Sequence, residues 1–298
     1  MPLPPSAPAH RVVDVVVTLA SNPGIDFSVS ELARAAGVNR TTCQSILFAL
    51  AERGWVQHRE DTGWRLGAGL VPIGDAALAS LEVVDEAQTE LDALVAELGL
   101  EALASVTAGS DIVIVAHAHS GRLLTDTVRL GQSIPFVPPF GIAHLAHAGE
   151  DAFDAWVARA TAPLSQAEQR MYRAAVHAAE TQGYVVVLDA EARRRFEADI
   201  AELARRPASR AARRSRDEMV ARLERESAAF GLHNGSGVSQ ISAAVFGPSG
   251  RPVLAIGLHA QPHQIEPERI AELGARVAAA AATITTRTSG RPPHPNET

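Results

Sequence analysis

The sequence predicts an α+β protein of two domains: a small helical domain with a two-stranded hairpin, then a larger domain built on an antiparallel sheet. Three observations support this prediction. The chain has 298 residues, a length that suits two domains. Its 46% hydrophobic content is sufficient for a buried core. Helical repeats dominate the first 50 residues, whereas the rest alternates strand-like and helical segments. We place the first domain at residues 1–74, the second at 75–288, and a disordered tail at 289–298.

Composition limits the possible functions. The formal net charge of −7 argues against a basic coat that covers nucleic acid non-specifically. Cys43 is the only cysteine, so an intrachain disulfide and a cysteine zinc cluster are both excluded. The segment 1–9 lacks the features of a signal peptide, and no apolar run approaches the ~20 residues that span a bilayer. We therefore expect a cytoplasmic protein that has no membrane partner and no cofactor.

The first domain shows the pattern of a helix-turn-helix followed by a hairpin. Apolar residues at helical spacing predict a helix over 10–20, and Ser28 with Glu31 forms a capping box before a short helix that ends at Gly37. Asn39 can cap a third helix over 40–53. Residues 55–59 and 64–66 then alternate like two short strands joined by a turn. This order predicts a winged helix-turn-helix.

A winged helix places its third helix in the major groove of DNA. In this sequence Cys43, Leu47 and Leu50 fall on one apolar face of that helix. Polar side chains that can reach bases or phosphates lie mostly off that face, and the hairpin adds two arginines for flanking phosphates. These candidate DNA contacts are Arg40, Thr41, Thr42, Gln44, Ser45, Arg59 and Arg65.

The charge of this domain leaves an alternative open. Residues 1–75 hold six arginines and seven acidic residues, whereas a DNA-binding domain is usually more basic. Residues 38–51 contain Arg40 and no acid, so the predicted reading face itself does not repel phosphate. We favour DNA binding over a purely structural or protein-binding winged helix. Phe48 and Cys43 fit packing roles better than base contact or redox sensing.

The second domain begins with a long helical stretch over 74–98 that can divide near Val83. Strands are predicted at 103–107, 112–116, 124–129, 184–188, 240–246 and 253–259, and helices at 141–148, 152–160 and 166–182. Pro267 opens a closing helix with Ile270, Leu273, Val277 and Ile284 on one stripe. Helices packed on an antiparallel sheet account for this order.

Several segments resemble the isocitrate lyase regulator (IclR) family of transcriptional regulators. In the first domain they are residues 29–33, 37–42, 47–50, 53–56 and 64–67. Downstream, residues 130–135 and 141–146 are similar to two landmarks early in that family's effector domain, and residues 241–246 and 254–258 to its final strand pair. The resemblance covers residues ~10–188 and ~234–288. It departs from the family pattern at Ser45, where many members have arginine, and at the stretch 233–237, which lacks an acid.

The resemblance implies a homodimer or homotetramer on a partly palindromic double-stranded DNA operator, acting as repressor or activator. It also implies a GAF-like second domain that binds a small metabolite, often an organic or aromatic acid. Residues on the matched landmarks become candidates for the effector site: Phe136, Val137, Phe140, His144, Ser242, Gly257 and His259. The phenylalanines suit an apolar or aromatic ligand body, and His144 or His259 can meet a carboxylate. Ordinary core packing of both phenylalanines is an equally good interpretation.

Residues ~189–232 resemble an insertion relative to the family and predict helix, loop and helix. The loop 205–216 holds six arginines and no acid. Contact with DNA or an acidic partner is one interpretation, and a solvated loop is the one we favour.

Two other functions are weighed against a regulator of this kind. His117 with His119, or His144 with His147, has a spacing that can share a metal ion, although no cysteine accompanies either pair. An enzyme with a winged-helix accessory is the second alternative, but no nucleophile elbow, phosphate loop or dinucleotide fingerprint is present. We therefore expect a non-enzymatic protein without a metal site.

Overall fold

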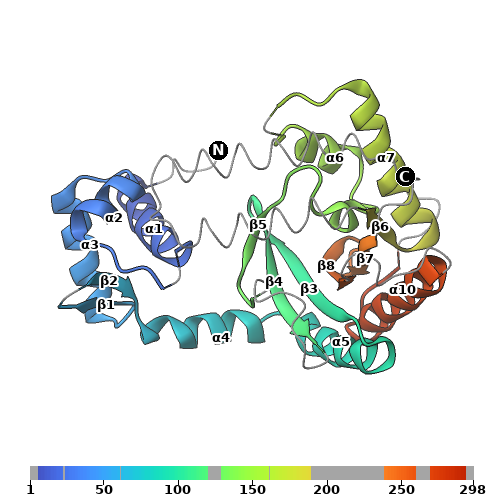
Figure 1. Cartoon of the computed structure of the whole chain (residues 1–298), viewed down its shortest axis with the longest axis horizontal. Coiled ribbons are helices and arrows are strands. Elements are labelled where there is room, and N and C mark those ends of the chain that lie inside the picture. The colour runs from blue at the N-terminus through green and yellow to red at the C-terminus, as the bar shows by residue number, and fades with distance from the viewer. Residues whose placement is uncertain are drawn as a thin grey trace. The chain divides into compact units, whose positions relative to one another are not determined.

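The computed structural model describes residues 6–22, 24–60, 62–119, 129–160, 162–188, 238–259 and 269–292. Their backbone divides into two compact units, with the division between Ser80 and Leu81 (Figure 1). The predicted insertion at 189–232, the strand residues 124–128 and the stretch 233–237 lie outside these ranges.

The N-terminal unit is a three-helix domain with a hairpin. Its elements are α1 (Ala7–Ala20), α2 (Val29–Ala36), α3 (Arg40–Glu52), β1 (Val56–Arg59) and β2 (Gly63–Leu66). Ser28 and Glu31 form the predicted capping box, Gly37 ends α2 in the left-handed conformation, and Asn39 caps α3 by accepting from the Thr42 amide. The winged helix-turn-helix predicted from the sequence is therefore confirmed.

A close backbone contact joins the hairpin to the helices. Phe27 pairs with Trp64 as an isolated antiparallel bridge, so the segment before α2 lies against β2. Gly63 has φ +115°, and a Cβ at this position would lie 2.5 Å from the Phe27 carbonyl oxygen. Glycine is required here both for the backbone angle and for the approach.

The connection after the hairpin is helical. A short 3₁₀ helix, η1 (Ala68–Leu70), leads into α4 (Val71–Ala79), and α5 (Val83–Leu98) follows after Ser80–Glu82. The predicted helical stretch therefore does divide near Val83. Every residue of α4 is exposed, whereas α5 buries Ala87, Leu91 and Leu94 completely.

The C-terminal unit is built on a six-stranded antiparallel sheet in the order β5-β4-β3-β8-β7-β6. The strands are β3 (Glu101–Ala108), β4 (Asp111–Ala118), β5 (Ser133–Pro135), β6 (Val185–Leu188), β7 (Val238–Phe246) and β8 (Pro252–His259). The central strands β3 and β8 pair through Glu101↔His259, Leu103↔Gly257 and Ser105↔Ala255. The short strand β5 was absent from the sequence prediction.

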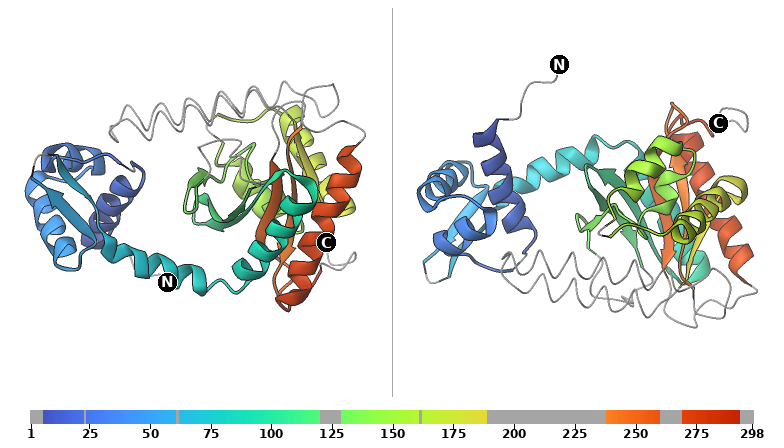
Figure 2. Two further views of the ribbon diagram at one scale, coloured as in Figure 1. Left: turned by 60° about the horizontal axis from the view of Figure 1, so that its bottom comes forward. Right: turned by 90° about the horizontal axis from the view of Figure 1, so that it is seen from above.

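Helices cover both faces of this sheet. One face packs on α5 and α10 (Ile270–Arg287), whose apolar stripe includes Leu273, Val277 and Ile284 as predicted (Figures 1 and 2). The other face packs on η2 (Ile142–Leu145), α6 (Glu150–Val157) and α7 (Gln166–Gln182). The helix predicted over 141–148 is thus a single 3₁₀ turn, because Gly141 and His147 both have positive φ and interrupt it.

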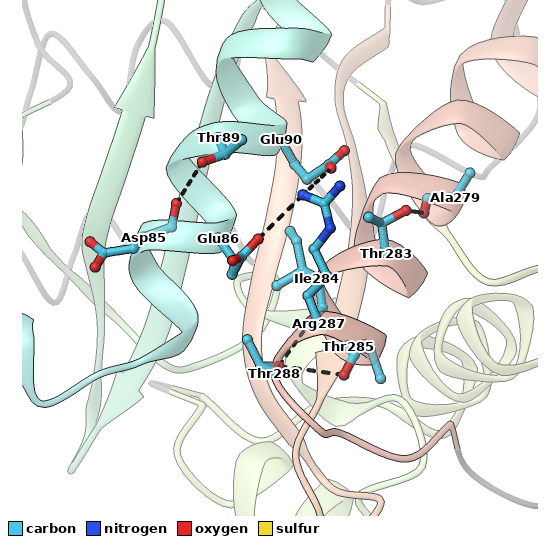
Figure 3. Close-up of polar contacts among 10 residues, drawn as sticks. All are labelled: Asp85, Glu86, Thr89, Glu90, Ala279, Thr283, Ile284, Thr285, Arg287 and Thr288. Atoms are coloured by element: carbon cyan, nitrogen blue, oxygen red, sulfur yellow. Dashed lines mark hydrogen bonds and ion pairs between the residues drawn. The ribbon is translucent and has the colours of Figure 1, made fainter.

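Polar contacts fasten the two helices of the first face to each other. The Arg287 guanidinium of α10 lies 3.3 Å from Glu86 Oε2 and 3.4 Å from Glu90 Oε1 of α5 (Figure 3). Arg276 also pairs with Glu97 at 2.8 Å. These pairs lie outside the apolar contact formed by Leu91, Leu94 and Ile284.

The first residues of the predicted disordered tail (289–298) have ordered contacts, whereas residues 293–298 lie outside the described ranges. The Gly290 amide donates to Thr285, and the Arg291 amide donates to the Gly247 carbonyl at 3.1 Å. Gly290 also lies so close to the Phe246 carbonyl that a Cβ would meet it at 1.9 Å. Residues 289–291 therefore pack on the β7–β8 turn. Within the described ranges, no helix combines the length and the hydropathy needed to cross a bilayer.

Candidate functional site

The third helix presents a continuous polar face. Cys43 and Leu47 are fully buried and Leu50 nearly so, whereas Arg40, Thr41, Gln44 and Ser45 are exposed and Thr42 is half-buried. This division follows the helical period, since exposed positions recur three or four residues apart. All five candidate contacts predicted on α3 thus lie at one surface, beginning at the helix N-terminus.

Not every polar group on this face is equally free. Ser45 Oγ donates to the Thr41 carbonyl at 3.1 Å, and Asn39 accepts from the Thr42 amide at 2.8 Å. Arg40 and Gln44 extend from the first and second turns. The partial positive charge of a helix N-terminus favours an anion at this end.

The two arginines of the hairpin differ in environment. Arg59 ends β1 and is exposed. Arg65 on β2 donates its Nε hydrogen to Asp26, and Thr62 donates to the same carboxylate. These two hydrogen bonds lower the pKa of Asp26, that of Arg65 being the larger cause. Arg65 therefore holds the hairpin to the segment before α2, and Arg59 is the freer cation.

An aromatic group next to this surface was missed as a unit by sequence reasoning. Trp64 is buried, with His58 at 4.9 Å and Phe48 edge-on at 6.2 Å between ring centroids. Phe48 has the predicted packing contact, but 56% of it remains exposed beside Gln44 and Ser45. The β1–β2 register places His58 opposite Trp64, and Phe48 reaches the same ring from α3.

In the C-terminal unit, buried polar side chains gather on one face of the sheet. Five of the eight buried polar residues in the described ranges belong to this group: Glu101, Ser105, His144, Ser242 and His259. Cross-strand partners point to the same face, so the register places Glu101, His259 and Gln240 in one row. Gly257 and Ser242 share the next row with Leu103. Burying polar groups is costly without partners, so such a cluster is a candidate functional site.

Gly257 makes room for the polar groups of the neighbouring strand. Gln240 Nε2 donates to Ser242 Oγ at 2.7 Å. A Cβ on Gly257 would lie 2.9 Å from Ser242 Oγ and 3.2 Å from Gln240 Nε2. The structure thus brings the predicted residues Ser242, Gly257 and His259 together, and it adds Gln240, which the sequence analysis omitted.

His144 covers this face from η2. Its Nε2 lies 3.1 Å from Ser105 Oγ, and its ring meets that of Phe136 at a centroid distance of 6.1 Å. Burial lowers the pKa of His144 to about 4, so the imidazole is neutral near pH 7. A neutral imidazole acts as a hydrogen-bonding group here, not as the cation that would attract a carboxylate.

The remaining predicted effector residues, Phe136, Val137 and Phe140, have different surroundings. Phe136 is half-buried beneath Arg159, whose guanidinium carbon lies 5.4 Å from the ring centroid. Val137 and Phe140 are also half-buried, and the Phe140 carbonyl accepts from Trp156 Nε1 at 2.9 Å. Phe136 therefore joins His144, while the backbone at Phe140 helps to anchor α6.

Glu101 was missed as a candidate, and His117 was considered only as a possible metal ligand. Glu101 Oε1 pairs with His117 Nε2, and the Glu101 side chain is only 1% exposed. An acidic residue at the start of an otherwise apolar strand was the available signal. Its meaning depended on the pairing of β3 with β8, which places Glu101 opposite His259, far away in the sequence.

The histidine pairs considered for metal binding have other contacts. His117 meets Glu101, and its ring lies 5.5 Å from that of His119. His144 meets Ser105, whereas His147 lies against Phe246. Over the part of the chain that the structure describes, no three His, Cys, Asp or Glu side chains are arranged to hold a metal ion.

Comparison with solved structures identifies the fold along almost the whole chain. A putative IclR transcriptional regulator from a Silicibacter species has a TM-score of 0.66 at 20% identity, covering 95% of this chain and 98% of that one. An IclR regulator from Alicyclobacillus acidocaldarius has a TM-score of 0.68 at 18% identity, covering 96% and 100%. An IclR homologue from Microbacterium hydrocarbonoxydans, complexed with 4-hydroxybenzoate, has a TM-score of 0.62 at 15% identity, covering 94% and 100%. No protein-family model and no curated protein matches the sequence. The chain has the fold of the IclR transcriptional regulators.

Proposed function

We propose that this chain, which has the IclR fold, is a transcription regulator. It binds an operator through α3, and it binds a small effector on the face of its C-terminal sheet that packs on η2. One observation carries the proposal. The polar side of α3, from Arg40 to Ser45, is exposed while its Cys43–Leu47–Leu50 side is buried. An exposed polar face on the second helix of a helix-turn-helix is the surface that such domains insert into the major groove.

The side chains of this surface define its contacts with DNA. Arg40 at the first turn can bond a guanine or a phosphate in two-pronged fashion, and Gln44 one turn later can pair with adenine. Thr41, Thr42 and Ser45 are close enough to the same major groove to contact bases or phosphates. Arg59 holds the flanking phosphate, whereas Arg65 acts indirectly, by fixing the hairpin through Asp26.

The buried polar face of the C-terminal sheet supports an effector site. Ser242, Gly257 and His259 lie on adjacent strands, with His144 and Phe136 reaching over from the η2 side. Apolar walls with a few polar anchors are typical of small-molecule sites. A small aromatic or organic acid is the effector class that we propose, in line with the 4-hydroxybenzoate bound to the Microbacterium homologue.

Exposed apolar side chains in the N-terminal unit support a homo-oligomer. Val13 and Val17 on α1 are 57% and 54% exposed, and Val71 and Ile73 on α4 are 69% and 45% exposed. Apolar side chains repeated on neighbouring turns of a helix are typical of an interface. A second copy of the chain is the partner that would pair two α3 helices for a palindromic operator.

The proposed mechanism is allosteric. The effector would change the spacing of two α3 helices in the oligomer, and two half-sites on one DNA face tolerate little change in that spacing. Affinity for the operator then depends on the effector concentration.

A genome-wide map of DNA occupancy tests this function. We expect the full-length chain to occupy a small set of promoters that share a palindromic element, and Arg40→Ala to lose that occupancy at equal protein level. Random occupancy by both proteins would refute sequence-specific regulation. The genes at the occupied promoters would direct the choice of effectors for binding measurements.

A further inference from the structure

The buried carboxylate of Glu101 has one oxygen in use and one without a partner. Glu101 begins β3, and its Oε1 pairs with His117 Nε2. Its Oε2 is buried and has no hydrogen-bond partner in the described part of the structure. A buried acceptor without a donor is destabilising, so native structures seldom keep one without a functional reason.

The register places this oxygen in the row next to Ser242 and Gly257. Glu101 lies opposite His259, and His259 lies opposite Gln240 on the next strand. The row of Leu103, Gly257 and Ser242 follows two residues along, a step of roughly 7 Å. Glu101, His259, Gln240 and Ser242 therefore form one polar floor across three strands, with the missing side chain of Gly257 in its middle.

This floor favours a particular chemistry in a ligand. A carboxylate acceptor requires an N–H or O–H donor, and a ligand carboxylate placed over Glu101 would meet a like charge. Leu103, which shares the row of Gly257 and Ser242, suits the apolar body of the ligand. A ligand that makes both contacts has an apolar body and, at the end that lies over Glu101, a hydrogen-bond donor.

We propose that Glu101 Oε2 accepts a hydrogen bond from a hydroxyl or amino group of the effector, which makes Glu101 a specificity-determining residue of the site. This inference rests on the proposed function, because it assumes that the effector binds on this face of the sheet. It adds a requirement: an acid that lacks a donor group away from its carboxylate binds poorly.

Matched probes test the requirement by calorimetry on the full chain. The pairs are 4-hydroxybenzoate with 4-methylbenzoate, 4-hydroxyphenylacetate with 4-methylphenylacetate, and tyramine with 4-methylphenethylamine. Each pair has the same size and differs in one donor. We expect the hydroxyl member of at least one pair to bind about tenfold more tightly, because its methyl partner leaves a buried acceptor unsatisfied.

Variants assign the preference to one atom. Glu101→Met removes both oxygens and is expected to abolish the preference, whereas Glu101→Gln keeps one acceptor and a similar shape and is expected to retain part of it. His117→Gln is the matched control, because His117 touches Oε1 and the control leaves Oε2 in place. Circular dichroism and operator binding check that each variant is folded.

The outcomes separate this inference from the proposed function. Equal affinities within every pair, or a preference that survives Glu101→Met, would overturn the role of Glu101 while leaving the effector site in place, provided that Gly257→Val weakens both members. If no probe binds the wild type at millimolar concentration, or if probes bind and Gly257→Val changes none of their affinities, the effector site on this face and the inference both fail.

Discussion

His144 shows at the scale of one residue how burial decides chemistry. Its imidazole extends from η2, with Nε2 3.1 Å from Ser105 Oγ, and burial lowers its pKa to about 4. Neutral histidine bonds one donor and one acceptor, so it orients neighbours without adding charge. Under the proposed function, a ligand carboxylate on this face would be held by hydrogen bonds from neutral groups such as Ser242 and Gln240.

The stability of the C-terminal unit is expected to fall with acid because of His144. An unfolded histidine takes up a proton below pH 6.5, whereas the folded one does so only near pH 4. The stabilisation is complete above pH 6.5 and is lost as the pH falls from 6.5 towards 4, by about 2 kcal/mol at pH 5 relative to pH 7.5. Urea unfolding of the wild type and of His144→Gln at both pH values measures this. Equal losses in the two proteins would show that His144 does not titrate in this way.

At the scale of elements, α3 is a helix whose two ends have different roles. Arg40 lies at the N-terminus next to the polar face, whereas Arg53 caps the C-terminus and is also exposed. Both are arginines at the surface of the same helix, so they form a matched pair for testing which end contacts DNA.

We expect Arg40→Ala to weaken operator binding roughly 5- to 150-fold, the range of ~1–3 kcal/mol for one base contact. Arg53→Ala should change affinity far less, because the C-terminal end of the helix repels phosphate. Fluorescence anisotropy on a promoter fragment from the occupancy map measures both. Equal effects of the two substitutions would show that net charge, and not the N-terminal end of α3, determines binding.

Substitutions in the α5–α10 contact can measure its apolar and its ionic contributions to stability separately. Ile284 is fully buried in it, while Arg287 bridges Glu86 and Glu90 at its edge. We expect Ile284→Ala to lower the free energy of unfolding by about 2–5 kcal/mol and Arg287→Ala by about 0–1 kcal/mol. Denaturant unfolding checks both values, with the Arg287→Ala effect reduced further in high salt. A larger loss for Arg287→Ala would mean that the ion pairs dominate this contact.

At the scale of the whole molecule, the proposed regulation requires two copies of the chain. The exposed apolar residues of α1 and α4 are the surface on which this pairing is expected. We expect Val71→Glu to shift the protein towards monomer in sedimentation velocity, because a charge in an apolar interface is costly to bury. Leu130→Glu is the control, since Leu130 is 60% exposed on the C-terminal unit. An unchanged distribution for Val71→Glu would remove α4 from the interface.

Local signals in the sequence were sufficient for most elements of the N-terminal unit. Ser28 with Glu31, Gly37 and Asn39 mark helix ends through contacts within four residues, so the sequence itself reports them. The same holds for the apolar stripe of α10. Prediction was poorer where the local pattern did not decide the structure. The segment predicted as a helix over 141–148 contains only the single turn η2, because two residues with positive φ interrupt it. Residues 289–291 are ordered by contacts with Gly247 and Phe246, which are distant in the sequence.

The sequence by itself determined the winged helix-turn-helix, the antiparallel sheet domain and the polar face of α3, because helix caps and the 3.6-residue period act between near neighbours. Only the tertiary structure decided how Arg65 is used, that His144 is neutral, and that Glu101 joins Ser242 and His259 on one floor. Strand register, burial and cross-strand contacts bring together residues far apart in the chain, and the hydrophobic pattern of one strand does not specify its partner.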